Sequence, residues 1–299
     1  MEENMTQSVC VIVTAWNQVD KTIPCLESVR VQTYENLSIL LVNNGSEDDT
    51  VEQVSRHFPS VDILTLPQNL GPTRGYNAGF RQALANQFDF VFLLNNDTLL
   101  APDCIATLVA EARTSPVIGL VMPKIYYAFE PQRIWSVGGW YNPWNLEVKR
   151  PGDNQIDNSQ WDEPIDIDDA PFCAVLLTRN ILETVGLPDE GFFLYYEDLD
   201  FCLRARQAGF RLRLVPAAQM WHVVSASSGG SDSPGERYWM ARSSIRYFRK
   251  HTRHFRWPIV VFWRTGSAVK TSLRLLAGRR FESLRAYWRG LGDGLREAL

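Results

Sequence analysis

Short apolar runs alternate with amphipathic stretches through the N-terminal half of the chain. An apolar run of about four to eight residues is typical of a buried strand, and apolar residues at helical spacing indicate an amphipathic helix. Their regular alternation predicts βαβ units, and therefore an α/β fold with a Rossmann-like, mostly parallel central sheet flanked by helices. The expected strands are 9–14, 37–42, 61–66 and 88–94, and the expected helices are 22–31, 50–57 and 75–86.

Polar clusters follow three of these predicted strands. They are 14–17 (Thr-Ala-Trp-Asn), 43–48 (Asn-Asn-Gly-Ser-Glu-Asp) and 95–97 (Asn-Asn-Asp). In an open parallel sheet, ligands bind outside the carboxyl ends of the strands, so we expect the clusters to meet in one crevice. Each cluster taken alone is equally typical of turns and helix caps.

Glycines 71, 75 and 79 recur at every fourth position of the segment 69–79. The dinucleotide-binding fingerprint belongs to the first strand-to-helix turn, and that turn holds no glycine here. A Gly-Lys-Ser/Thr phosphate loop is also missing from the sequence. The spacing instead predicts close packing of a helix beside the ligand.

Acidic residues follow an aromatic run in the segment 191–209, at a predicted helix start. An apolar wall raises the pKa of a carboxyl group and helix amides lower it, so Glu197 and Asp198 could be tuned for proton transfer. The alternative is structural, because acids often cap helices, and Asp200 has the i,i+4 spacing of an ion pair with Arg204.

The charge of the chain is divided unevenly. Residues 237–299 hold 15 Lys and Arg against 3 Asp and Glu, so they carry +12, whereas residues 1–236 carry −16. Aromatic residues alternate with the basic ones, a combination that suits a membrane interface. The longest apolar run, 257–263, is far shorter than the roughly 20 residues that span a bilayer. Packing on the main domain is the competing interpretation, and nucleic-acid binding ranks last because no nucleic-acid fold accompanies the charge.

The five cysteines (10, 25, 104, 173 and 202) are scattered without metal or disulfide spacing. They predict reduced core thiols in a cytoplasmic protein. The first apolar run, 9–15, lacks the basic flank and cleavage site of a secretory signal, so we expect a buried strand there.

Taken together, these motifs resemble the family 2 glycosyltransferases, inverting sugar-nucleotide enzymes with a GT-A fold, and within them the bacterial rhamnosyltransferase-like members. The resemblance covers about residues 8–255 and rests on the three polar clusters, the segment 69–79, Tyr195 to Asp200, and His222 before a Ser/Gly-rich stretch. It implies a catalytic domain over 1–235, with a nucleotide-binding half at about 8–120 and an acceptor-binding half at about 121–235. Residues 236–299 would form a basic, amphipathic, helical C-terminal region.

The resemblance also implies roles for individual residues. Asp198 would be the general base, with Glu197 orienting the acceptor or supporting Asp198. The composition of segment 225–235, nearly all Ser, Gly, Asp and Pro, separately predicts a flexible lid over the nucleotide. Mg2+ or Mn2+ would bind at Asp97, Asn95 and His222, completed by phosphate oxygens and water. The nucleotide would contact Thr14, Ala15, Asn17, Asn43, Ser46, Asn69, Gly71, Arg74, Asn77 and Asn96, with Arg74 facing the diphosphate.

The sequence departs from the family pattern in three places. Pro171-Phe172-Cys173-Ala174 stands where a Gly-Ala pair is usual before an apolar strand, so we expect Phe172 to reshape the sugar or acceptor pocket. At the other two places an amide replaces an acid. Asn95 stands where the first acid of the Asp-x-Asp metal motif is usual, and Asn43 stands at the base-reading position, where Asp is usual. An amide oxygen can still accept a hydrogen bond or touch a metal, but more weakly than a carboxylate. Metal affinity and nucleobase preference are therefore the properties most affected.

The expected activity is inverting transfer of a sugar, L-rhamnose from dTDP-rhamnose by resemblance, to a glycan or lipid-linked saccharide of a bacterial surface polysaccharide. A UDP-hexose donor on the same fold is one alternative. A non-catalytic sugar-nucleotide-binding or assembly protein is the other, with Asn43 and Asn95 as marks of lost chemistry. We expect a cytoplasmic protein that contacts the inner face of the plasma membrane peripherally.

Overall fold

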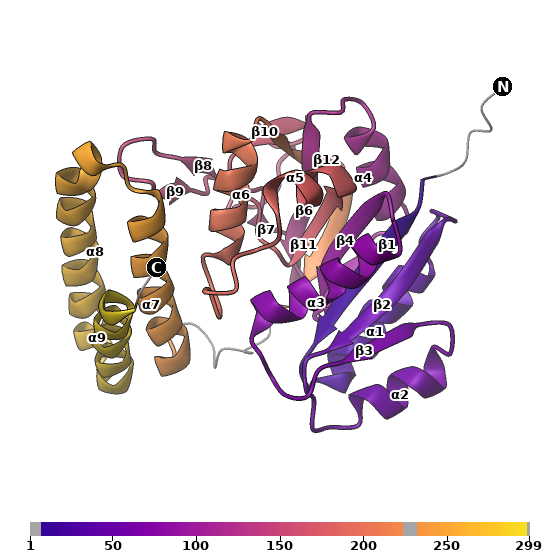
Figure 1. Cartoon of the computed structure of the whole chain (residues 1–299), viewed down its shortest axis with the longest axis horizontal. Coiled ribbons are helices and arrows are strands. Elements are labelled where there is room, and N and C mark those ends of the chain that lie inside the picture. The colour runs from indigo at the N-terminus through magenta and orange to yellow at the C-terminus, as the bar shows by residue number, and fades with distance from the viewer. Residues whose placement is uncertain (1–6, 224–231, 298–299) are drawn as a thin grey trace.

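The computed structural model describes residues 7–223 and 232–297, and within them a ten-stranded sheet forms the centre of the molecule (Figure 1). The strand order is β10-β12-β6-β11-β4-β1-β2-β3, with β5 paired to β12 and β7 to β6. Strands β1 (Val9–Ala15), β2 (Leu37–Asn43), β3 (Asp62–Thr65) and β4 (Phe90–Asn95) pair in parallel. The predicted βαβ alternation and parallel sheet are confirmed.

The helices of this half are α1 (Val19–Arg30), α2 (Thr50–His57) and α3 (Pro72–Ala85). Helix α3 begins three residues before its predicted start because Pro72 suits the first turn of a helix. It packs tightly on the sheet at Gly79, where an added Cβ would lie 2.7 Å from the Ile12 Cγ2 atom. The close packing expected from the glycine spacing is confirmed.

The second half of the sheet contains mostly antiparallel additions. Strand β11 (Ala174–Thr178) lies antiparallel to both β4 and β6 (Ile118–Tyr127), while β12 (Arg211–His222) runs parallel to β6. This arrangement brings the end of β12 beside the turn after β4. The remaining elements are β5 (Thr98–Leu100), α4 (Cys104–Ala112), β7 (Glu130–Ser136), β8 (Trp140–Tyr141), β9 (Val148–Lys149), β10 (Ile165–Ile167), α5 (Arg179–Val185) and α6 (Glu197–Gln207).

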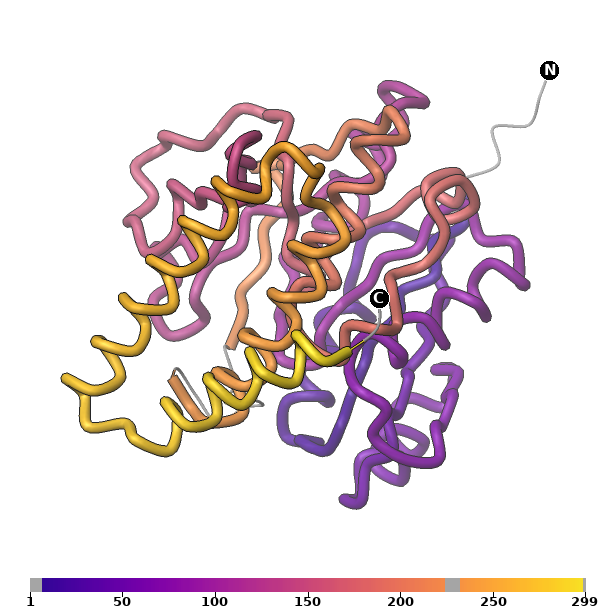
Figure 2. The backbone as a smooth tube through the Cα atoms, turned by 60° about the vertical axis from the view of Figure 1, so that its left-hand side comes forward, coloured from indigo at the N-terminus to yellow at the C-terminus, as the bar shows by residue number. Residues whose placement is uncertain are grey.

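The C-terminal region is helical, as predicted, with α7 (Pro234–His251), the 3-10 turn η1 (His254–Arg256), α8 (Trp257–Ala277) and α9 (Phe281–Arg296). Helix α8 runs along the outer edge of the molecule and α9 returns toward the centre (Figure 2). Helix α7 is tied to α6 by Asp200, whose carboxylate lies 2.8 Å from both Lys250 Nζ and His251 Nε2. Phe192, Tyr247 and Phe248 add a shared hydrophobic cluster.

Four further expectations concern the cysteines, the Asp200–Arg204 pair, the lid segment and membrane-spanning helices. All five cysteines are buried and free. The Asp200–Arg204 ion pair forms at 2.9 Å. Of the lid segment expected at 225–235, residues 225–231 lie outside the described residues, and 234–235 begin α7. Within the described ranges, none of the helices has the length and apolar character needed to cross a bilayer.

Candidate active site

A cavity of about 520 Å3 lies where β1, β4 and β12 end. The pairing explains the convergence, because Ala15 is in register with Asn43 and Thr14 with Asn95. Seven of the predicted site residues line this cavity: Thr14, Ala15, Asn69, Asn95, Asn96, Asp97 and His222. Each of the three polar clusters contributes to the cavity, the second through Asn44 alone, so the expected meeting of the strand ends in one crevice is found.

Asp97 and His222 form the most polar corner of the cavity. The Nε2 atom of His222 lies 3.1 Å from Asp97 Oδ1, and both side chains are buried. The edge of the Trp135 ring fixes the imidazole, with centroids 4.7 Å apart at 86°. His222 Nδ1 is buried and has no hydrogen-bond partner within the described part of the chain. This corner offers one carboxylate and one imidazole nitrogen as possible ligands of a metal ion.

The described residues contain no group of three His, Cys, Asp or Glu side chains arranged around one point. Such a group is not required for a divalent ion that binds together with a nucleotide diphosphate, since Mg2+ commonly keeps one or two protein carboxylates and takes its other ligands from phosphate and water. Asp97 and His222, with the Asn95 amide at the same cavity, fit that pattern. Asn95 Oδ1 accepts a hydrogen bond of 3.3 Å from the Tyr76 hydroxyl.

Asn17, Asn43 and Ser46 join two loops instead of lining the cavity. The backbone N–H of Asn17 donates to Ser46 Oγ at 2.8 Å, and that of Ser46 donates to Asn43 Oδ1 at 2.9 Å. Asn17 Oδ1 in turn accepts from the Glu47 backbone at 2.9 Å. These side chains hold the β1–α1 and β2–α2 loops in place, which fixes the shape of the neighbouring cavity wall.

Asn44, which sequence reasoning did not select, organises the next wall. Its Oδ1 accepts from the Leu70 backbone at 3.0 Å, and its Nδ2 donates to the Gly71 carbonyl at 3.1 Å. Gly71 has φ +85°, and an added Cβ would lie 2.7 Å from the Phe193 ring, so glycine is needed there. Asn77 is fully buried and donates to the Pro188 carbonyl at 2.9 Å, which anchors the loop before α6.

Glu197 and Asp198 begin α6, directly after Tyr195 and Tyr196, whose φ angles are +66° and +71°. Glu197 is only 6% exposed. Burial, followed by the charge of Asp198, raises the pKa of Glu197 to about 8. Burial, followed by the charge of Asp169, raises the pKa of Asp198 to about 7. Each of these two carboxyl groups can therefore gain or lose a proton near neutral pH.

Glu197 and Asp198 are not among the residues that line the cavity, whereas Tyr76 and Tyr195 are. Burial, then the charges of nearby groups that include Glu197, Asp198 and Asp97, hold the pKa of Tyr76 far above its usual range. The buried Asp169 forms an ion pair with Arg150, whose side chain is partly exposed, and the charge of Arg150 counteracts part of the rise in the Asp198 pKa. Neither residue was selected from the sequence, because no motif marks them.

The C-terminal region completes the cavity. Gly235 and Trp239 of α7 contribute to its lining, and Trp239 stacks on Phe193 with ring centroids 4.3 Å apart at 18°. The aromatic residues of 237–299 were expected to suit a membrane interface, so sequence reasoning did not predict Trp239 in the cavity. In the same region Phe248 and Val260 are buried, whereas Val261, Phe262 and Trp263 are exposed.

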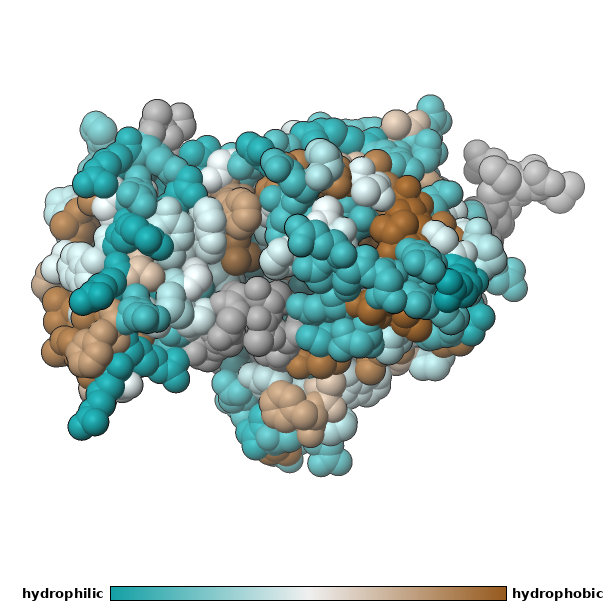
Figure 3. Space-filling view, turned by 90° about the horizontal axis from the view of Figure 1, so that it is seen from below, coloured by the Kyte–Doolittle hydropathy of each residue, from teal (hydrophilic) through white to brown (hydrophobic). Residues whose placement is uncertain are grey.

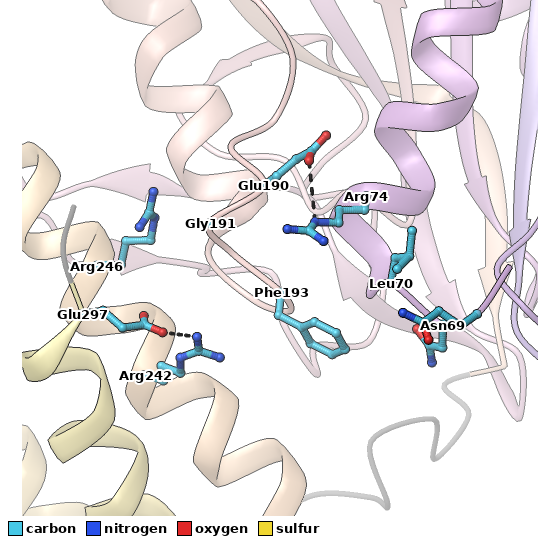
Figure 4. Close-up of a pocket in the computed structure, with 10 residues that line it drawn as sticks. Asn69, Leu70, Arg74, Glu190, Gly191, Phe193, Arg242, Arg246 and Glu297 are labelled. Atoms are coloured by element: carbon cyan, nitrogen blue, oxygen red, sulfur yellow. Dashed lines mark hydrogen bonds and ion pairs between the residues drawn. The ribbon is translucent and has the colours of Figure 1, made fainter. Parts of the chain in front are cut away.

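Arg74 does not line this cavity. It lines an adjoining one of about 510 Å3, together with Glu190, Arg242 and Arg246 (Figure 4). Its Nε atom lies 3.5 Å from Glu190 Oε2. The two cavities share Asn69 and Phe193.

Comparison with known proteins places this site in a family. Residues 10–184 match Glycosyl transferase family 2. The chain is 25% identical over 233 residues to the N-acetylglucosaminyl-diphospho-decaprenol L-rhamnosyltransferase of Mycobacterium tuberculosis, a match over 68% of this chain and 72% of that protein. It is 27% identical over 243 residues to the uncharacterized protein y4gI of Sinorhizobium fredii, a match over 78% of this chain but 26% of that protein.

A solved structure extends the comparison to the whole fold. The mannosyltransferase of Pyrobaculum calidifontis, in complex with GDP-Man and Mn2+, superposes with a TM-score of 0.58 at 16% identity, over 99% of this chain and 77% of that one. Because the family match covers more than half of the chain, this protein belongs to glycosyl transferase family 2, and it has the GT-A fold of such enzymes.

Proposed function

We propose that this protein transfers a sugar from a nucleotide diphosphate donor to a hydroxyl of a saccharide acceptor, with inversion at the anomeric carbon. The observation that carries the proposal is the buried acid pair at the start of α6, which begins two residues after Tyr195, a lining residue of the cavity that also holds Asp97 and His222. A carboxyl with a pKa near the working pH is well suited to general-base catalysis.

Asp198 is the proposed base. Its Oδ1 accepts a hydrogen bond from its neighbour's backbone N–H, that of Leu199, at 2.8 Å, so we assign proton uptake to Oδ2. The acceptor oxygen forms a bond to the anomeric carbon while the bond from that carbon to the diphosphate oxygen breaks. The acceptor proton passes to Asp198, whose proton affinity is raised by burial and then by the charge of Asp169. Glu197, buried beside it, is proposed to orient the acceptor or to support Asp198.

Asp97 and His222, with the Asn95 amide oxygen, are the proposed holders of Mg2+ or Mn2+. When bound, the ion would offset the negative charge of the departing diphosphate. Thr14, Ala15, Asn69 and Asn96 are the proposed contacts to the nucleoside and ribose, since they line the same cavity. Asn17, Asn43, Ser46, Gly71 and Asn77 would act by holding the surrounding loops.

The donor is proposed to be dTDP-L-rhamnose, with a UDP-hexose as the alternative. Support comes from the Mycobacterium tuberculosis relative, an N-acetylglucosaminyl-diphospho-decaprenol L-rhamnosyltransferase. By the same comparison, the acceptor is proposed to be a lipid-linked saccharide of a bacterial surface polysaccharide.

Peripheral membrane contact is proposed for the outer face of α8. Val261, Phe262, Val269, Leu273 and Leu276 are all exposed and recur at helical spacing along it. Lys270, Arg274, Arg279 and Arg280 lie on or directly after the same helix. Figure 3 shows apolar surface at the left-hand end of the molecule, over the C-terminal helices, with hydrophilic side chains around it. An apolar stripe flanked by basic groups suits the surface of an anionic bilayer.

The proposal is tested by nucleotide binding followed by transfer. Thermal unfolding is measured with dTDP, UDP and GDP, each with and without Mn2+, because a ligand at 100 times its Kd stabilises the folded state by about 2.7 kcal/mol. Transfer from dTDP-rhamnose and from UDP-hexoses is then followed by nucleotide release. Metal-dependent stabilisation by dTDP or UDP, together with sugar transfer, is expected. Binding without transfer to any acceptor in a lipid-linked panel would favour the non-catalytic alternative.

A further inference from the structure

The cavity that holds Asp97 and His222, which we call the donor cavity, adjoins a second cavity lined by three arginines (Figure 4). This basic cavity is built from distant parts of the chain. Arg74 comes from the first turn of α3, whereas Arg242 and Arg246 lie one turn apart on α7. Glu190 and Gly191 come from the segment before α6, and Glu297 follows α9. The cavity therefore exists only because the C-terminal helices are docked on the catalytic domain.

Two carboxylates, Glu190 and Glu297, line the cavity with the three arginines, and they contact those arginines unequally. Glu190 is engaged mainly by Arg81 at 2.5 Å and Asn77 at 3.1 Å, and it lies a longer 3.5 Å from Arg74. Arg246 is held by Asp189, whose oxygens lie 3.2 Å from its Nη2. The Glu297 carboxylate contacts Arg242 and so shows how an anion can be bound there.

The donor does not account for this cavity. The stacked rings of Phe193 and Trp239 stand beside Asn69 where the two cavities adjoin, and Asp97 and His222 line only the donor cavity. A donor whose diphosphate lies at Asp97 would not occupy the cavity lined by Arg74, Arg242 and Arg246, because Asp97 does not line it. A second phosphate-bearing group would fit these arginines by exchanging with their carboxylate partners.

We propose that this basic cavity binds the diphosphate of the lipid-linked acceptor. The inference rests on the proposed glycosyltransferase function and specifies its acceptor as one with phosphate next to the saccharide. Guanidinium groups bind phosphate oxygens through paired, charge-assisted hydrogen bonds, and Arg74 and Arg242 enter the cavity from opposite sides. The acceptor diphosphate replaces the Glu297 carboxylate on Arg242 and reaches Arg74 across the cavity.

The first experiment uses inorganic pyrophosphate as the probe and isothermal calorimetry with EDTA present, so that metal-dependent binding at Asp97 does not contribute. Arg74→Gln and Arg242→Gln are each expected to weaken binding about tenfold or more, since each removes hydrogen bonds to a charged group. Glu297→Gln removes the competing carboxylate and is expected to tighten binding severalfold. The matched control is Arg81→Gln, because Arg81 lies on the same helix, pairs with the same Glu190 and does not line the cavity.

The second experiment identifies the source of the diphosphate. The Kd values of dTDP with Mn2+ and of farnesyl diphosphate with EDTA are compared in the same variants, whose melting temperatures are checked first. Weaker farnesyl diphosphate binding with unchanged dTDP binding supports an acceptor site. An equal loss of dTDP affinity in Arg74→Gln would assign the arginine to the donor and overturn the proposal. No pyrophosphate binding by the wild-type protein, or equal effects of Arg74→Gln and Arg81→Gln, would also overturn it, whether or not sugar transfer is found.

Discussion

Asp198→Asn is expected to stop transfer and at the same time stabilise the protein at alkaline pH. Burial makes the folded protein bind a proton at Asp198 more tightly than the unfolded chain does. The proton on Asp198 therefore adds its full contribution to the free energy of unfolding below about pH 4, and this contribution is lost as the pH rises through 7. The rise of the pKa from 3.8 to about 7 corresponds to a loss of about 4 kcal/mol over that range.

Asparagine has nearly the same shape as aspartate and cannot ionise, so the variant keeps the packing and removes this loss. At pH 8 the variant is expected to be more stable than wild type by up to about 4 kcal/mol, and near pH 4 to be similar. Transfer should fall about 100-fold to 10,000-fold, the usual contribution of a general base. In wild type, the transfer rate should rise with pH through about 7, as Asp198 loses its proton.

The assays are urea unfolding at several pH values and initial rates of nucleotide release. The matched control is Asp200→Asn in the same helix. Burial acts to raise the pKa of Asp200, but His251, Arg204 and Lys250 hold it at about 2, so its stabilisation is present above about pH 4 and lost as the pH falls through 2. Asp200→Asn should therefore destabilise the protein at pH 8 by about 2 kcal/mol or more. Loss of stability in Asp198→Asn at pH 8, or normal turnover, would refute the reasoning.

Three further changes test other parts of the structure. Asp97→Asn should weaken Mn2+-dependent dTDP binding at least about tenfold and spare metal-free binding, measured by calorimetry; equal losses in both conditions would point to a folding defect instead. Phe262→Asp combined with Val269→Asp should abolish sedimentation with anionic vesicles, since each removes an exposed apolar contact from α8. The control is Phe129→Asp, at an equally exposed ring far along the chain, and similar behaviour of both proteins would contradict the assignment of the face. Gly79→Ala should cost about 1–3 kcal/mol in urea unfolding, because its Cβ would press on the buried Ile12, and a gain in stability would show that Ile12 can yield.

The strands and helices of the first half could be predicted because their signal is local. Apolar runs such as that of β1 indicate burial on both faces of a sheet, and α2 was predicted with the bounds it has, Thr50–His57. The motif order also placed Asp97, Asn95 and Asn96 at a strand end, and the rule for parallel sheets placed that end at a ligand crevice. The family followed from the same motifs.

Tertiary packing decided what each polar residue does once it is there. Asp97 and His222 are 125 positions apart and meet because β12 pairs with β5. Asn77 and Arg74 lie on one helix, yet packing buries the first against the loop at Pro188 and directs the second into the basic cavity.

The sequence by itself determined the alternating elements, the polar strand ends and the family. Only the tertiary structure decided the raised pKa values of Glu197 and Asp198, the contribution of Trp239 to the cavity at Asp97 and His222, and the second cavity between α3 and α7. The physical reason is that hydrophobic periodicity acts over a few neighbouring residues. Burial of a charge and the meeting of distant side chains depend instead on how whole elements pack.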